Sequence, residues 1–241
     1  MIYVNSNPKK MFWLTLFSCI ALFWFDSALK VWGEERTKSE DKNAKENAFI
    51  LNEILKKIEE RYIGPGFRAE FEQQSTITAM EITDSASGKL FVKRPGKMRW
   101  EYVLPEAQII TSDSNDLWIY RPEDNQVLIG KAPSFFADGK GATFLSDVKN
   151  VRKEFIVTLE GSDKKGNSVI KLVPKKKSTQ LTEIRLTISS HTDTIDQIVT
   201  KNEYSDETRI QISKYQFNQD LAEDLFVLKI PNGADVLQLD Q

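Results

Sequence analysis

The sequence predicts a mainly β protein of the α+β class, in which one large antiparallel sheet is partly covered by helices. After residue 66 most segments alternate apolar and polar residues, and a period of two is typical of half-buried strands. About ten such segments follow one another with short turns between them, which favours an antiparallel meander. Two stretches with helical character, residues 48–62 and 133–147, interrupt this pattern.

Composition excludes several classes of protein. The 241 residues carry 33 basic and 35 acidic side chains, interspersed along the chain, so there is no basic footprint for nucleic acid. The single histidine, His191, lies in a predicted turn, which excludes His-rich metal sites and disfavours a Ser-His-Asp triad. The single cysteine, Cys19, precedes the predicted domain, which is compatible with an oxidising compartment.

The N-terminal region is expected to be a targeting segment. Lys9 and Lys10 precede an apolar run over residues 11–25, which is short for a membrane span and typical of a secretory signal peptide. We expect a signal peptide over residues 1–33, cleaved after Gly33. Retention of the run as an anchor, or lipidation of Cys19, are the alternatives.

A charged spacer and a helix are expected next. Residues 34–47 have almost nothing to bury and are predicted to be disordered. In residues 48–62, apolar side chains recur at helical spacing, and Gly64-Pro65-Gly66 ends the helix. The folded domain is therefore expected to span residues 48–241.

The segment from Gly88 to Pro105 is predicted to be two strands that meet at Pro95-Gly96. Leu90 and Val92 alternate with polar residues before the corner, and a second alternating set follows it. That set is bulky and adaptable: Met98, Trp100 and Tyr102. Arg94 lies where the first strand meets the corner, at the rim of this apolar surface.

The remaining elements follow from turn residues. Residues 84–88, rich in Ser, Asp and Gly, are predicted to be a turn. Residues 221–225 are predicted to be a short helix or turn, and residues 226–230 the final strand. The other expected strands are 67–74, 108–112, 117–120, 126–129, 154–160, 168–174, 181–189, 195–203 and 208–217. Residues 133–147 are expected to be two short helices around a glycine-rich break.

The block Phe-Val-Lys-Arg-Pro-Gly-Lys-Met-Arg-Trp-Glu-Tyr, residues 91–102, resembles the signature of the LolA-type periplasmic outer-membrane lipoprotein carrier family. The similarity extends through residues 105–110 and 117–122, and to the closing Ile-Pro-Asn-Gly-Ala-Asp-Val at 230–236. It covers the chain roughly from Ala48 to the C-terminus, and the Lys-Arg-Pro and Arg-Trp-Glu-Tyr motifs are its most specific parts.

The resemblance implies a curved antiparallel sheet that forms an open half-barrel, with lid helices over an apolar cavity. It implies that Arg94 is a latch that hydrogen-bonds lid carbonyls in the empty protein. The expected acyl-chain cavity residues are Phe71, Leu90, Val92, Met98, Trp100, Tyr102, Trp118 and Tyr120. The expected lid residues are Phe135, Phe136, Phe144 and Leu145.

The resemblance further implies a periplasmic monomer that needs no cofactor and performs no catalysis. Its partners would be acylated lipoproteins, an inner-membrane lipoprotein release complex and an outer-membrane lipoprotein acceptor. Two other classes stay open at this stage. One is a lipid-binding regulator or membrane-anchored acceptor of the same fold, and the other is an enzyme, for which no acid–base pair stands out.

Overall fold

The computed structural model describes residues 42–132, 145 and 151–239. Residues 50–241 form one compact unit, and residues 1–49 form another, of which only the exposed helical residues 42–49 are described. The strands are β1 Gly66–Ile77, β2 Ile82–Lys93, β3 Lys97–Leu104, β4 Gln108–Ser112, β5 Asp116–Arg121, β6 Gln126–Lys131, β7 Phe155–Ser162, β8 Ser168–Pro174, β9 Glu183–Ile188, β10 Ile195–Lys201, β11 Glu207–Phe217 and β12 Asp235–Gln238.

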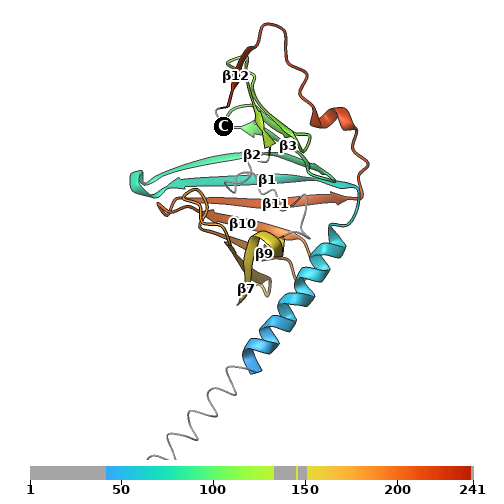
Figure 1. The fold of residues 1–241 in the computed structure, drawn as a ribbon, viewed down its shortest axis with the longest axis vertical. Helices are drawn as coiled ribbons and strands as arrows, with labels where there is room; N and C mark the ends of the chain where they lie inside the picture. The colour runs from blue at the N-terminus through green and yellow to red at the C-terminus, as the bar shows by residue number, and fades with distance from the viewer. Residues whose placement is uncertain (1–41, 133–144, 146–150, 240–241) are drawn as a thin grey trace, which may run out of the picture. The chain divides into compact units, whose positions relative to one another are not determined.

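All twelve strands belong to one curved sheet (Figure 1), in the order β12-β6-β5-β4-β3-β2-β1-β11-β10-β9-β8-β7. Every pair is antiparallel except β12 with β6. Strands β12 and β7 end the order, so the sheet, as far as the structure describes it, is open and does not close into a barrel. The predicted mainly β fold with a large antiparallel sheet is confirmed.

A helix over residues 42–61 precedes the sheet. It includes residues 42–47, which the composition assigned to a disordered spacer. Lys, Glu and Ala are strong helix formers, and a helix already stabilised by packing further along extends readily into such residues. Leu51, Leu55, Ile58 and Tyr62 are buried, as their helical spacing predicted.

The chain leaves this helix through a tightly fixed turn. A Cβ on Gly64 would lie 2.4 Å from the Asn218 side-chain oxygen, so a larger residue here would displace the Asn218 side chain. Tyr62 then accepts a hydrogen bond from the Ile195 backbone N–H at 3.1 Å. The register of the β9–β10 ladder shifts between Ile195 and Gln197. At this irregularity the hydroxyls of Tyr62 and Tyr215 hydrogen-bond the backbone N–H and carbonyl of Ile195.

The first hairpin differs from the expected one. Residues 84–88 lie within β2, and the connection is instead the 3-10 turn η1, Thr78–Met80, followed by Glu81 with a φ of 55°. The expected turn at 84–88 is wrong because β1 pairs with β2 along its whole length, from Gly66↔Lys93 to Ile77↔Ile82. Strand pairing here overrides the local preference of Ser, Asp and Gly for turns.

The C-terminal segment also departs from the prediction. Residues 226–230 are not a strand; the 3-10 helix η4, Glu223–Phe226, comes first, and β12 follows at residues 235–238. Phe226 is fully buried, and the residue before it is held by β3, since Arg99 donates to the Leu225 carbonyl at 3.1 Å. Glu223 pairs with Lys93 at 2.9 Å and also with Lys97.

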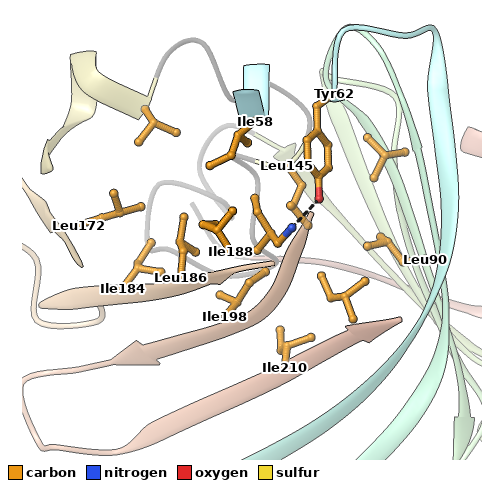
Figure 2. Close-up of a cluster of buried hydrophobic side chains, with 14 of the residues drawn as sticks. Ile58, Tyr62, Leu90, Leu145, Leu172, Ile184, Leu186, Ile188, Ile198 and Ile210 are labelled. Atoms are coloured by element: carbon orange, nitrogen blue, oxygen red, sulfur yellow. Dashed lines mark hydrogen bonds between the residues drawn. The ribbon is translucent and has the colours of Figure 1, made fainter. Parts of the chain in front are cut away.

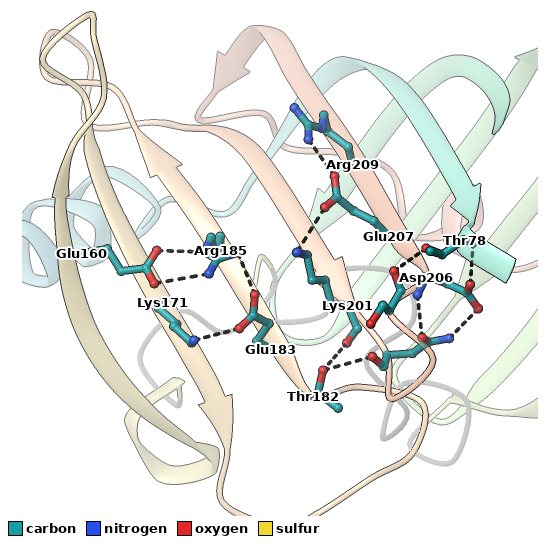
Figure 3. A network of polar contacts seen from close by, with 12 residues as sticks. Thr78, Glu160, Lys171, Thr182, Glu183, Arg185, Lys201, Asp206, Glu207 and Arg209 are labelled. Atoms are coloured by element: carbon teal, nitrogen blue, oxygen red, sulfur yellow. Dashed lines mark hydrogen bonds and ion pairs between the residues drawn. The ribbon is translucent and has the colours of Figure 1, made fainter. Parts of the chain in front are cut away.

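The sheet has an apolar inner face and a largely polar outer face. Figure 2 shows the inner face of the β8–β11 half, where Ile184, Leu186, Ile198 and their neighbours pack under Ile58 of the helix. Figure 3 shows charged side chains on the outer face of β7–β11, with Arg185 bridging Glu160 and Glu183. The Lys171 ammonium and Arg185 hold the pKa of the Glu183 carboxyl below its ordinary value.

Candidate functional site

The strand register brings most of the predicted cavity residues together on the inner face. Directly paired residues of an antiparallel ladder point to the same side of the sheet. Trp100 pairs with Leu90 on β2, and Met98 pairs with Val92. Phe71 on β1 pairs with Gly88, which pairs with Tyr102. Phe71, Leu90, Val92, Met98 and Trp100 are buried and belong to the cluster that includes the helix residues, and half-buried Tyr102 packs against it.

Aromatic rings form the centre of this patch. The Phe71 ring meets the Trp100 ring edge-on at 4.8 Å and the Tyr102 ring at 5.0 Å. Gly88 lies between Phe71 and Tyr102, and a Cβ there would come within 1.9 Å of the Glu101 carbonyl oxygen. The site therefore needs glycine, and its missing side chain leaves room for the two rings to meet above it.

The Tyr102 hydroxyl and the Trp100 indole N–H differ in their hydrogen bonding. The Tyr102 hydroxyl donates to the Gln73 side-chain oxygen at 3.1 Å, and burial raises the pKa of Tyr102 to about 12. The Trp100 indole N–H is buried and has no hydrogen-bond partner among the residues that the structure describes. Tyr102 is thus a satisfied member of the patch, whereas Trp100 retains an unused donor.

Two of the predicted cavity residues lie on the other face. Trp100 pairs with Ile110, Ile110 with Ile119, and Ile119 with Leu128, so Ile119 faces inward. Trp118 and Tyr120, its neighbours along β5, therefore face outward and are half-buried there. Placing them with Trp100 was wrong because β5 is apolar on both faces, and alternation alone cannot choose between an aromatic and an aliphatic set.

The sequence did not predict that β8–β11 form the second half of the inner face. Buried residues of β8–β11 share one cluster with Phe71, Leu90 and Trp100: Ile170, Leu172, Ile184, Leu186, Ile188, Ile198, Ile210 and Ile212. Figure 2 labels Leu172, Ile184, Leu186, Ile188, Ile198 and Ile210 among them. Their alternation with polar residues predicted strands but not their common face. The pairing of β1 with β11, which joins the two halves, links segments more than 130 positions apart, such as Phe71 with Ile212.

Of the expected lid residues, Phe135, Phe136 and Phe144 lie outside the described part of the chain. Leu145 is described and fully buried, and it belongs to the inner-face cluster together with Val151, at the start of α3, Val151–Glu154. Leu51, Leu55 and Ile58 of the helix belong to the same cluster. Two separate segments therefore cover parts of the inner face.

Arg94 follows β2 directly, two positions after inward-facing Val92. Its backbone N–H donates to the Pro65 carbonyl at 3.0 Å, and Ser114 donates to the Pro95 carbonyl at 2.9 Å. The side chain is half-buried, and one terminal guanidinium nitrogen is fully shielded from solvent. The arginine is thus held at the end of the strand that carries Leu90 and Val92.

The described residues contain no group of three or more His, Cys, Asp or Glu side chains arranged to hold a metal ion. His191 is exposed, as its predicted turn implies. None of the described helices is long and apolar enough to cross a membrane.

These features define a class of protein, namely an open antiparallel sheet with an apolar, aromatic inner face that helical segments cover. Comparison with known proteins gives the family. The model of the family described as "Outer membrane lipoprotein carrier protein LolA" matches residues 65–229. The chain belongs to this family, which is one of carrier proteins and not of enzymes.

Individual relatives agree with this assignment. An outer-membrane lipoprotein carrier protein from Chromobacterium violaceum is 30% identical over 173 residues, covering 71% of this chain and 81% of that protein. One from Cupriavidus taiwanensis is 28% identical over 174 residues, covering 71% and 81%. Among solved structures, an uncharacterized conserved protein from Thermus thermophilus aligns with a TM-score of 0.52 and 15% identity, over 78% of this chain and 99% of that one.

Proposed function

We propose that this protein carries lipoproteins and takes up their acyl chains against the inner face of the sheet. The observation that carries the proposal is the family match over residues 65–229, which spans nearly the whole sheet. The buried patch around Phe71, Leu90, Val92, Met98, Trp100 and Tyr102 supports it. Its side chains are large, adaptable and apolar, which suits them to contact acyl chains.

The energetics explain why such a carrier needs an apolar interior. Each methylene left in water costs about 0.8 kcal/mol, so the acyl chains of one lipoprotein represent tens of kcal/mol. In our account the inner face supplies this burial, and the helix residues and Leu145 move away to admit the chains. Burial alone drives the uptake, which requires no cofactor.

The route that we propose is the one that the family resemblance implies. We propose that the protein acts in the periplasm as a monomer, with residues 1–33 as its signal peptide and residues 48–241 as the carrier domain. It would receive lipoproteins from an inner-membrane release complex and deliver them to an outer-membrane acceptor.

Arg94 is proposed as the latch of the empty carrier. An arginine has five donors in a fixed geometry, which suits it to several backbone carbonyls at once. Its shielded guanidinium nitrogen and its place at the end of β2 support a role at the rim of the inner face. In this proposal loading breaks the latch bonds, and their re-formation offsets part of the cargo's burial when the cargo leaves.

Binding of acyl chains is tested by competition. A dye that fluoresces in apolar surroundings is bound to the full-chain protein, and a peptide carrying acyl chains is added. We expect the acylated peptide to displace the dye, and the same peptide without acyl chains to leave it bound. Failure of the acylated peptide to displace the dye, or equal displacement by both peptides, would contradict the proposal.

The latch is tested by Arg94→Leu, with Arg121→Leu as its control. Arg121 also ends a strand and precedes a proline, but it is exposed. Charge-assisted hydrogen bonds contribute on the order of 1.5–3 kcal/mol each, so Arg94→Leu should retain lipoprotein at least as well as the wild type. It should pass on about tenfold less to the outer-membrane acceptor. Poor loading combined with normal transfer would make Arg94 a cargo contact and not a latch.

A further inference from the structure

Trp100 combines near-complete burial with an unused hydrogen-bond donor. The residue is only 3% exposed, and its indole nitrogen has no hydrogen-bond partner among the described residues. Two tyrosines that pack against the same cluster behave differently, since Tyr102 donates to Gln73 and Tyr215 donates to the Ile195 carbonyl. Buried donors in native proteins are nearly always paired, so an unpaired one at a binding surface requires an explanation.

The surroundings of Trp100 restrict what could accept from it. Its cross-strand neighbours are Leu90 and Ile110, and the edge contact with Phe71 covers another side. An anionic acceptor would be desolvated there at high cost without an opposite charge beside it. A ligand rich in hydroxyl groups would leave most of those groups unpaired. The site fits a ligand that is apolar apart from one neutral acceptor.

We propose that the Trp100 N–H donates a hydrogen bond to the ester or amide carbonyl at the head of a bound acyl chain. This inference rests on the proposed function and adds a specific contact to it. The carbonyl is the only polar group adjacent to the methylenes, so pairing it at Trp100 sets how deeply the chain enters. Trp100 is thereby a specificity-determining residue that distinguishes acyl chains from alkyl ethers and plain hydrocarbons.

The test compares two ligands that differ only at the carbonyl. One is a cysteinyl peptide with two ester-linked acyl chains, and the other is its dialkyl ether analogue of equal chain length. Satisfying a buried donor is worth about tenfold in affinity, so the wild-type full chain should prefer the ester by about that factor. In Trp100→Phe the ratio of the two affinities should fall to about one. In Trp118→Phe, which changes the outward-facing tryptophan, the preference should persist.

A spectroscopic readout separates this contact from mere packing. The indole N–H resonance of Trp100 is assigned by its loss in Trp100→Phe, among the five tryptophans of the chain. It should shift on addition of the ester and stay in place with the ether.

The outcomes distinguish the two claims. If both ligands bind the wild type equally and the resonance does not move, the Trp100 contact is wrong while acyl binding stands. If neither ligand binds, the proposed function itself fails, and the inference fails with it.

Discussion

At the residue scale, two tyrosine hydroxyls satisfy the backbone N–H and carbonyl of Ile195, where the β9–β10 ladder is irregular. Ile195 donates its N–H to the Tyr62 hydroxyl at 3.1 Å and accepts from the Tyr215 hydroxyl at 2.7 Å. The Tyr62 ring also meets Phe67 and Phe217 edge-on, at 5.4 and 5.2 Å. Tyr62 therefore joins the end of the helix to β10 and β11 through both its ring and its hydroxyl.

Removing that hydroxyl should destabilise the fold. Tyr62→Phe keeps the ring but leaves the buried Ile195 N–H without its acceptor, which costs about 1–3 kcal/mol. We expect the midpoint of urea unfolding to fall with no change in slope. Tyr204→Phe is the control, because Tyr204 is 70% exposed and its loss should change little. Equal stability of the two variants would show that the hydrogen bond does not stabilise the protein.

The same tyrosine should contribute to alkaline unfolding. Burial raises the pKa of Tyr62 to about 12, above the ordinary tyrosine value of about 10. The folded state holds the proton more tightly than the unfolded state, so this stabilisation is complete below pH ~10 and is lost as the pH rises towards 12. The free energy of unfolding should decline less steeply above pH ~10 in Tyr62→Phe than in Tyr204→Phe. Parallel declines would contradict this assignment.

The side of the sheet that a side chain faces could be predicted from the sequence only where the two faces of a strand differ in polarity. Phe67, Ala69 and Phe71 alternate with Arg68, Glu70 and Glu72, and the structure buries the first set and leaves the second more accessible. Along β5 both sets are apolar, so the inward-facing set could not be chosen without its partner strands. The register of β4 decides it, and that register is not encoded locally.

At the element scale, the C-terminal segment is held by η4, which overlaps the short helix or turn expected at residues 221–225, through contacts that the sequence did not predict. Residues 226–230 look like a strand because they alternate, but η4 places Phe226 in a fully buried position beside β3 instead. The anchoring contacts come from Lys93, Lys97 and Arg99, whose own sequence neighbours give no sign of these partners. Contacts across more than 120 positions decide this element, and local pattern cannot report them.

Truncating Phe226 should show how firmly η4 is attached. Phe226→Ala removes a fully buried ring, which typically costs about 3–5 kcal/mol. Val227→Ala, at the neighbouring position with 45% exposure, should cost far less. Chemical denaturation of both variants checks this, and a loss below about 1 kcal/mol for Phe226→Ala would mean that η4 packs only loosely.

At the scale of the whole sheet, pairing of β1 with β11 joins two meanders into a single inner face. One runs from β1 to β6 and carries the aromatic patch, and the other runs from β7 to β11 and carries mainly isoleucine and leucine. The sequence predicted nearly all of the strands and their antiparallel order. It could not predict the pairing of β1 with β11, because these strands are more than 130 positions apart in the chain.

We propose that acyl chains lie against the inner face of the sheet and not against the outer one. Tyr102 and Tyr120 form a matched pair for testing it, since both are half-buried tyrosines and they face opposite sides of the sheet. A photo-crosslinking amino acid is placed at either position in the full chain, and lipoprotein adducts are measured after irradiation. Our account predicts adducts through the acyl chains at position 102 and none at position 120. Adducts at 120 to the same extent, or none at 102 in a folded protein, would contradict it.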